Sequence, residues 1–185
     1  MLWVIIALVV LVIIVLWAVA AYNGLVKLRN LVQEAWHQID TELQRRHDLI
    51  PNLVETVKGY AAHEKETFQA VTEARAAAAN PGSSPAEQAQ QENVLTQALG
   101  RLFAVAEAYP ELKANVNFLQ LQTELANTED RVAAGRRFYN ANVRELNTKI
   151  ETVPTSIIAS IFKFVKAEYF ETEDPAARQA PTVSF

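Results

Sequence analysis

An uncharged, almost wholly aliphatic run at the N-terminus constrains the fold of this chain more than any other feature. Leu2 to Ala21 contains no charged residue, and fourteen of the positions from Leu2 to Val19 are Leu, Ile or Val. As a helix, this run would be about 30 Å long, which is the thickness of a bilayer's hydrocarbon core. Its Leu, Ile and Val side chains alone favour membrane insertion by about 4 to 8 kcal/mol. We therefore expect residues 1–21 to be a transmembrane anchor.

The residues that flank this run are of types that favour the membrane interface. Trp3 and Trp17 lie near its two ends and Tyr22 follows it, and aromatic rings of this kind prefer the headgroup region. Lys27 and Arg29 come next, whereas no Lys or Arg precedes the run. Since basic residues collect on the cytoplasmic side, the chain is predicted to be a single-pass protein with a cytoplasmic C-terminal domain.

A cleaved signal peptide is the alternative to a retained anchor. Ala18-Val19-Ala20 resembles a cleavage site, but no basic residue precedes the run, and the run is longer than the apolar core of a signal peptide. The chain has no cysteine, which excludes a lipoprotein anchor and disulfides. We expect the anchor to be retained.

The rest of the chain repeats apolar residues with a helical period. One series, which continues directly from the anchor, is Leu25, Leu28, Val32, Ala35/Trp36, Ile39 and Leu43. A later series, with the seven-residue spacing of coiled coils, is Leu125, Val132, Tyr139 and Leu146. Such stripes are typical of amphipathic helices that pack together. The predicted fold class is all-α: a transmembrane helix followed, over residues 22–153, by an antiparallel bundle of about four long helices.

Two prolines interrupt the stripes. Pro51 lacks a backbone donor, so the helix is expected to kink or restart there, with Asp48 as the N-cap of the restarted helix. Tyr109 and Pro110 mark a second kink or restart. A long hairpin kinked once and a compact four-helix bundle that turns at both prolines fit this pattern equally well.

The clearest helix start follows a turn at residues 80–85. Ser84 fits the N-cap, Pro85 the first helical position, and Glu87 the partner of a capping box.

The C-terminal part is expected to form a short amphipathic helix over residues 154–170 and an extended acidic tail over residues 171–185. The helix either caps the bundle or forms an interfacial or oligomer contact. The predicted contact residues are Ile157, Ile161, Phe164 and Phe185.

No recognisable catalytic motif is present. There is no cysteine nucleophile, and the five glycines form no phosphate loop or dinucleotide fingerprint. Glu34 and His37 have the Glu-x-x-His spacing of di-iron bundles, which require a second such motif that the chain lacks. No cofactor or metal is therefore expected, and a metal-dependent enzyme that uses Glu34 and His37 is kept as an alternative.

The remaining charged groups give little indication of a site. The net charge of −4 excludes a nucleic-acid footprint, and the doublets Arg45-Arg46 and Arg136-Arg137 are expected to be solvated. His47 and His63 are expected to be solvated or to cap helices.

Long runs of the sequence resemble the LemA family. They include Arg45 to Tyr60 (RRHDLIPNLVETVKGY), Ala61 to Arg75 (AAHEKETFQAVTEAR), Val105 to Asn115 (VAEAYPELKAN), Phe118 to Glu129 (FLQLQTELANTE) and Arg136 to Asn142 (RRFYNAN). Gly135 stands where the family pattern has Ala. The resemblance implies an N-terminally anchored protein of the bacterial inner membrane with a four-helix antiparallel domain, and it does not imply an enzyme.

The leading hypothesis is a non-enzymatic, membrane-anchored scaffold or adaptor. Its expected partners are the lipid bilayer and either further copies of the chain or another membrane protein, with no nucleic acid and no small-molecule substrate. An extracytoplasmic sensor or envelope protein, which requires the opposite topology, is a further alternative.

Overall fold

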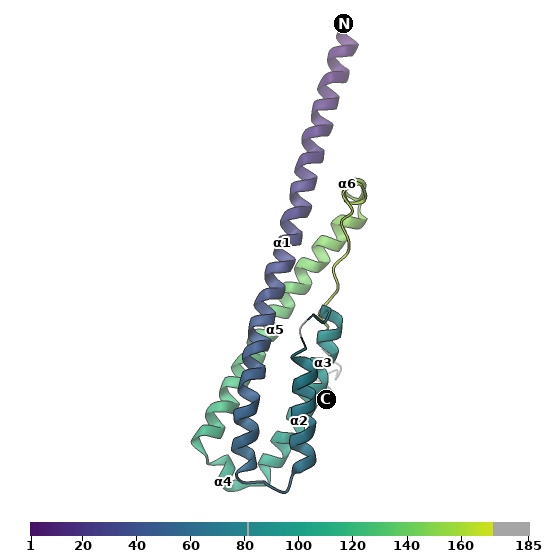
Figure 1. Ribbon diagram of the computed structural model, residues 1–185. Helices are drawn as coiled ribbons and strands as arrows, with labels where there is room; N and C mark the ends of the chain where they lie inside the picture. The colour runs from purple at the N-terminus through teal and green to yellow at the C-terminus, as the bar shows by residue number, and fades with distance from the viewer. Residues whose placement is uncertain (81, 172–185) are drawn as a thin grey trace, which may run out of the picture. The chain divides into compact units, whose positions relative to one another are not determined.

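The computed structural model describes residues 1–80 and 82–171, and every regular element in these ranges is an α-helix. The helices are α1 (Leu2–Lys58), α2 (Lys65–Ala78), α3 (Pro85–Glu107), α4 (Pro110–Lys113), α5 (Val116–Glu151) and α6 (Thr155–Ile161) (Figure 1). The predicted all-α class is confirmed. The contacts divide the described chain into two compact units: unit 1 comprises residues 1–39 and 135–169, and unit 2 comprises residues 40–134 with 170 and 171.

Unit 2 is an up-and-down arrangement of four long helical segments and one single-turn helix. It contains the last part of α1, then α2 and α3, the single turn α4 and the first part of α5, and consecutive long helices run in opposite directions (Figure 1). Short connections between consecutive helices favour this arrangement. Its core is formed by apolar residues of all these helices, among them Ile50, Leu53, Val57, Phe68, Val71, Leu95, Leu102, Leu112, Phe118 and Leu125.

The ends of the helices in unit 2 follow local chemistry. The Ser84 hydroxyl accepts a hydrogen bond from Glu87 N, and the Glu87 carboxylate accepts one from Ser84 N, so the capping box is formed as expected with Pro85 at the start of α3. Gly82 has a φ of 97°, a conformation that favours glycine. At the start of α5, Asn115 Oδ1 accepts from Phe118 N, which satisfies one of the unpaired donors there.

α1 runs through Pro51 without a break, so the predicted restart at this residue is wrong. Asp48 is therefore not an N-cap; it is exposed on α1 and accepts a hydrogen bond from Gln44. The carbonyl that Pro51 leaves without a helical donor is that of His47, and Arg75 Nε of α2 donates to it at 2.6 Å. The neighbouring helix thus replaces the hydrogen bond that the proline removes.

The first turn of the bundle lies after Pro51, at residues 59–64. Gly59 is the only helix breaker in this segment, and it does not adopt a positive φ. By contrast, the predicted restart at Pro110 is present: Tyr109 is the N-cap residue of α4 and Pro110 is its first residue. The compact bundle is therefore the right alternative for unit 2, with its first turn displaced toward the C-terminus.

Unit 1 is built from the first part of α1, the last part of α5, and α6. Its buried apolar residues are Leu25, Leu28, Val32, Ala35 and Ile39 of α1, Tyr139, Val143 and Leu146 of α5, and Ile158 and Ala159 of α6. Before Leu25 the apolar run of α1 projects from these contacts and is exposed along nearly all of its length (Figure 1). This run is long and apolar enough to cross a membrane.

α6 ends at Ile161, whereas the sequence predicts a helix as far as residue 170. Lys163 adopts a φ of 54°, which stops the helix. Phe164 N donates to Ala159 O, and Lys163 N donates to Ser160 O. This pair of hydrogen bonds is a Schellman motif, in which a residue in the left-handed region closes the helix. Sequence alone gives little warning, because glycine usually occupies this position and a lysine stands here.

The residues after this turn are non-helical and are held along α5. The Asn147 side chain bonds both backbone groups of Ala167: Nδ2 donates to the carbonyl and Oδ1 accepts from the amide, both at 2.9 Å. The Tyr139 hydroxyl donates to Glu168 O at 2.8 Å. These bonds replace the helical bonds that the segment gives up. The predicted tail at residues 171–185 and its contact residue Phe185 lie outside the described residues, Glu171 excepted.

Candidate functional site

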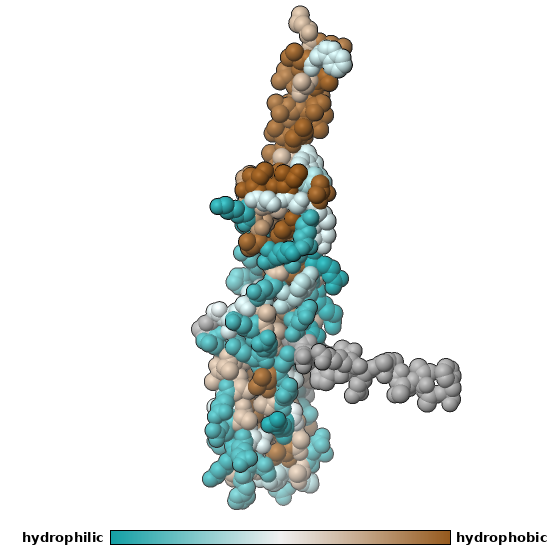
Figure 2. Space-filling view, turned by 90° about the vertical axis from the view of Figure 1, so that its right-hand side faces the viewer, coloured by the Kyte–Doolittle hydropathy of each residue, from teal (hydrophilic) through white to brown (hydrophobic). Residues whose placement is uncertain are grey.

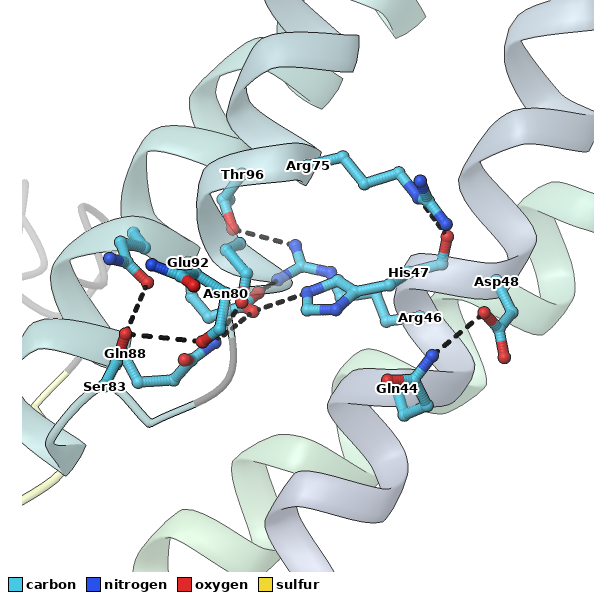
Figure 3. Close-up of polar contacts among 12 residues, drawn as sticks. Gln44, Arg46, His47, Asp48, Arg75, Asn80, Ser83, Gln88, Glu92 and Thr96 are labelled. Atoms are coloured by element: carbon cyan, nitrogen blue, oxygen red, sulfur yellow. Dashed lines mark hydrogen bonds and ion pairs between the residues drawn. The ribbon is translucent and has the colours of Figure 1, made fainter.

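A cluster of charged side chains lies inside unit 2. Arg46 and His47 of α1 are 4% and 3% exposed, and Glu92 of α3 is 2% exposed. Figure 3 shows the two α1 side chains pointing toward the Glu92 carboxylate from one side, with Gln88 of the same helix beside it. Burying charges is costly unless they are paired, so the partners of these side chains matter for the stability of unit 2.

The Glu92 carboxylate accepts hydrogen bonds from three residues. Arg46 Nη1 lies 2.7 Å from Oε2, His47 Nε2 lies 2.7 Å from Oε1, and Gln88 Nε2 donates to Oε1 at 3.1 Å. Since a carboxylate only accepts, the His47 Nε2 atom carries the proton in this contact. The other Arg46 nitrogen, Nη2, donates to Thr96 Oγ1 at 2.8 Å and lies 3.0 Å from the Glu129 carboxylate.

The polar atoms of the cluster are paired within the protein. Both Glu92 oxygens and both terminal Arg46 nitrogens have partners within the protein, and Gln88 also donates to the carbonyl of Ala78. A catalytic acid, base or metal ligand needs a free lone pair or proton directed at a substrate. These groups are directed at one another and at other groups of unit 2. The expectation that Arg46 and His47 are solvated is wrong.

Glu34 and His37 are not joined by further metal ligands among the described residues. Both side chains lie on the exposed face of α1. No group of three His, Cys, Asp or Glu side chains that could hold a metal ion occurs in residues 1–80 and 82–171. The pair alone therefore gives the metal-dependent alternative no further support.

Unit 1 carries a second grouping, made of aromatic rings at the end of the apolar run. The Tyr22 ring lies 4.6 Å from that of Phe162 and 5.9 Å from that of Phe164. The Arg29 guanidinium lies over the Phe164 ring, 5.4 Å from its centre, within the range of a cation–π contact. The turn that follows α6 therefore packs against the first residues of α1 beyond the run.

The same part of unit 1 exposes large apolar side chains. We call it the α6 cap: residues 153–165, whose exposed apolar side chains are Val153 (80%), Ile157 (55%), Ile161 (65%), Phe162 (55%) and Val165 (80%). In the space-filling view, a second brown area lies just below the projecting N-terminal helix (Figure 2). Clustered apolar exposure of this kind is typical of surfaces that contact a protein or a membrane.

The predicted site residues are distributed over both groupings. Trp3, Trp17 and Lys27 are exposed on α1, while Tyr22 and Arg29 contact the turn after α6. Of the predicted partner contacts, Ile157 and Ile161 are exposed. Phe164 is half-buried by contacts within unit 1, so less of its side chain is exposed to a partner than at Ile157 and Ile161.

Sequence reasoning missed the buried cluster, although a signal for it exists. The stripe Ile39, Leu43, Ile50 and Leu53 passes through positions 46 and 47, so continuing the helical period places Arg46 and His47 on the buried face. The prediction of a helix restart at Pro51 divides this stripe in two, so the positions between its halves are not assigned to the buried face.

Comparison with known proteins identifies the family. The model of the LemA family matches residues 35–185, which is most of the chain. This chain belongs to the LemA family. The match includes the parts of α1, α3 and α5 that form the buried cluster.

Two curated relatives illustrate the range of this LemA-family similarity. Protein LemA of Metamycoplasma hominis is 30% identical over 155 residues, which cover 82% of this chain and 69% of the relative. Magnetosome protein MamQ 1 of Paramagnetospirillum magneticum is 30% identical over 180 residues, which cover 84% of this chain. The chain spans 66% of the length of that magnetosome relative.

Proposed function

We propose that this chain is a membrane-anchored, non-enzymatic scaffold or adaptor that self-associates or binds another membrane protein. The observation that carries the proposal is the exposure of the apolar run of α1 in a chain whose helices α2, α3 and α5 bury their own apolar stripes. An apolar run of this length would be unfavourable in water, and a bilayer is the solvent that matches it.

The polar chemistry of the described residues supports a non-enzymatic role. The buried Arg46, His47 and Glu92 are engaged with one another and with unit 2, and the exposed Glu34 and His37 have no third ligand among the described residues. The two relatives, a LemA protein and a magnetosome protein, are not named for a reaction.

The orientation in a bacterial inner membrane, with the helical units in the cytoplasm, is part of the proposal. Lys27 and Arg29 are the basic residues nearest the apolar run, and both are exposed. Basic residues at this position favour retention of that side in the cytoplasm.

Cysteine accessibility tests the orientation, because the chain has no cysteine of its own. A Val94→Cys variant places one thiol on an exposed position of α3. Labelling by a membrane-impermeant maleimide only after cell permeabilisation supports the cytoplasmic orientation. Labelling in intact cells would contradict it and would favour the extracytoplasmic sensor or envelope protein.

The assembly state tests the scaffold role. The mass of the full-length protein in mild detergent is compared with the products of crosslinking in native membranes. A defined oligomer, or a reproducible crosslink to one membrane protein, supports the proposal. A monomer that forms no crosslinked product in its native membrane would contradict it. Stoichiometric metal that is lost in a His37→Ala variant would instead favour the enzyme alternative.

A further inference from the structure

We propose that the α6 cap is a second membrane contact, inserting into the interface of the leaflet from which α1 emerges. The occupant of this apolar surface is therefore the lipid headgroup and upper acyl-chain region. The inference rests on the membrane anchor in the proposed function and adds a site that the anchor does not require.

The α6 cap contacts α1 at the end of the apolar run. Tyr22 is the residue directly after the apolar run, and its ring contacts both Phe162 and Phe164. If the run spans the hydrocarbon core, Tyr22 lies at its boundary, where tyrosine side chains are enriched. Phe162 and Phe164 touch that ring, so they lie at the same depth.

The chemistry of the cap matches this depth. Ile157, Ile161 and Phe162 are more than half exposed, and they are joined by Val153 and Val165. Burial in the interface removes this apolar surface from water, which stabilises the bound state in proportion to its area.

Basic residues accompany this apolar surface. Lys163 lies exposed at the turn itself, between Phe162 and Phe164, and Arg29 lies over the Phe164 ring. Lys166 is also near, where it is paired with Glu151. Apolar side chains bordered by Lys and Arg are typical of elements that lie in the membrane interface, because the ammonium and guanidinium groups remain among the phosphates.

Lipid is favoured over a second copy of the chain by this location. The end of α1's apolar run is already surrounded by lipid when the anchor is inserted, so contact between the cap and the bilayer needs no additional association. A second copy would have to displace that lipid and lose its translational freedom to cover the same residues.

Spin labels on single cysteines in the full-length chain test the proposal. The protein is reconstituted in vesicles of phosphatidylcholine and phosphatidylglycerol, and each label's collisions with oxygen, which concentrates in the bilayer, are compared with those of a water-soluble nickel chelate. The test positions are Ile157→Cys and Ile161→Cys. Val10→Cys, within the apolar run, serves as the lipid reference.

Phe138→Cys is the matched water reference. Phe138 is 52% exposed and belongs to the same unit. The ring of its neighbour Tyr139 lies 5.5 Å from that of Trp36, and Trp36 follows Tyr22 on α1 by fourteen residues, or about 21 Å of helix. An exposed apolar residue at that distance from the interface should report water.

The expected result is an oxygen-to-nickel collision ratio at Ile157 and Ile161 severalfold above that at Phe138 and below that at Val10. Ratios equal to that of Phe138, with Val10 in lipid, would overturn the cap proposal and leave the anchor intact. Exclusion of both reagents, together with spin–spin broadening, would also overturn it by showing a contact between copies. A Val10 label in water would instead contradict the anchor itself.

Discussion

Arg75 Nε donates a 2.6 Å hydrogen bond to the backbone carbonyl of His47, four residues before Pro51. In a helix without proline, the N–H of residue 51 would bond this carbonyl. The long side chain from α2 supplies the missing donor, so α1 continues for seven residues beyond the proline to Lys58.

The first prediction concerns this replacement. Arg75→Ala should lower the free energy of unfolding by about 1 to 3 kcal/mol, because the His47 carbonyl loses its donor. The same change in a Pro51→Ala background should have a clearly smaller effect, since the alanine introduced there has an N–H that can bond the carbonyl. Denaturant unfolding of the four proteins in one detergent, followed by far-ultraviolet circular dichroism, measures the difference. Equal losses in both backgrounds would show that Arg75 acts through some other contact.

The second prediction concerns the buried ion pair. Glu92→Leu should destabilise the protein by about 3 to 5 kcal/mol, because Arg46 remains buried without its main countercharge. Adding Arg46→Met should recover part of this loss, so the double variant loses less stability than the sum of the two single variants. The same denaturant titration measures all three.

An exposed pair is the control for this cycle. Glu55 lies 3.1 Å from Lys58 with both side chains at least half exposed. Glu55→Gln should change the stability by less than about 0.5 kcal/mol, since exposed ion pairs contribute little. Strictly additive losses at Arg46 and Glu92 would mean that the two residues do not act as a pair.

The third prediction is a pH dependence. Burial raises the pKa of Tyr139 from its ordinary value of 10.0 to about 12, and the nearby negative charge of Glu168 adds to the rise. The unfolded chain therefore releases this proton at lower pH than the folded chain. The stability contributed by the neutral phenol is complete below pH 10 and is lost as the pH rises from 10 toward 12.

Comparison with a Tyr139→Phe variant isolates this effect from other groups that titrate at high pH. The variant should be less stable at neutral pH by about 1 kcal/mol, because it lacks the hydrogen bond to Glu168 O. Its stability should fall less steeply than that of the unmodified chain above pH 10. Parallel curves for the two proteins would argue against a raised pKa at Tyr139.

The fourth prediction compares two glycines within helices. At Gly100 in α3 an added Cβ meets no atom within 4 Å, so Gly100→Ala should stabilise the protein by about 0.5 to 1 kcal/mol. At Gly135 in α5 a Cβ would lie 3.1 Å from Cγ1 of Ile39. Gly135→Ala should therefore gain less, because Ile39 must shift. Thermal unfolding of both variants provides the test, and an equal gain would indicate that Ile39 moves at no cost.

The parts of the fold that depend on short-range chemistry are predictable from sequence. The capping box of Ser84 and Glu87 needs only neighbouring residues, and it is formed as expected. The positions of the seven-residue series, Leu125, Val132, Tyr139 and Leu146, are all buried, because a helical period alone selects one face.

The parts that depend on distant partners are not predictable in the same way. Pro51, considered with its neighbours alone, predicts a helix break. The helix continues because Arg75, 24 residues later, donates the hydrogen bond that the proline cannot. The sequence predicts a longer α6 than the structure has. The segment after α6 is not helical because its backbone forms hydrogen bonds with the side chains of Asn147 and Tyr139, which lie on α5. In each case a side chain from another helix reverses a local preference.

The buried charge cluster also restricts how the helices of unit 2 align. An apolar stripe repeats every turn, so α3 could slide along α1 by one turn, about 5.4 Å, and still bury hydrocarbon against hydrocarbon. Glu92 has no such freedom, because one turn of sliding would separate its carboxylate from both Arg46 and His47 and leave these buried charges without their closest partner on α3. The charges thus define one alignment among several that the apolar residues would accept.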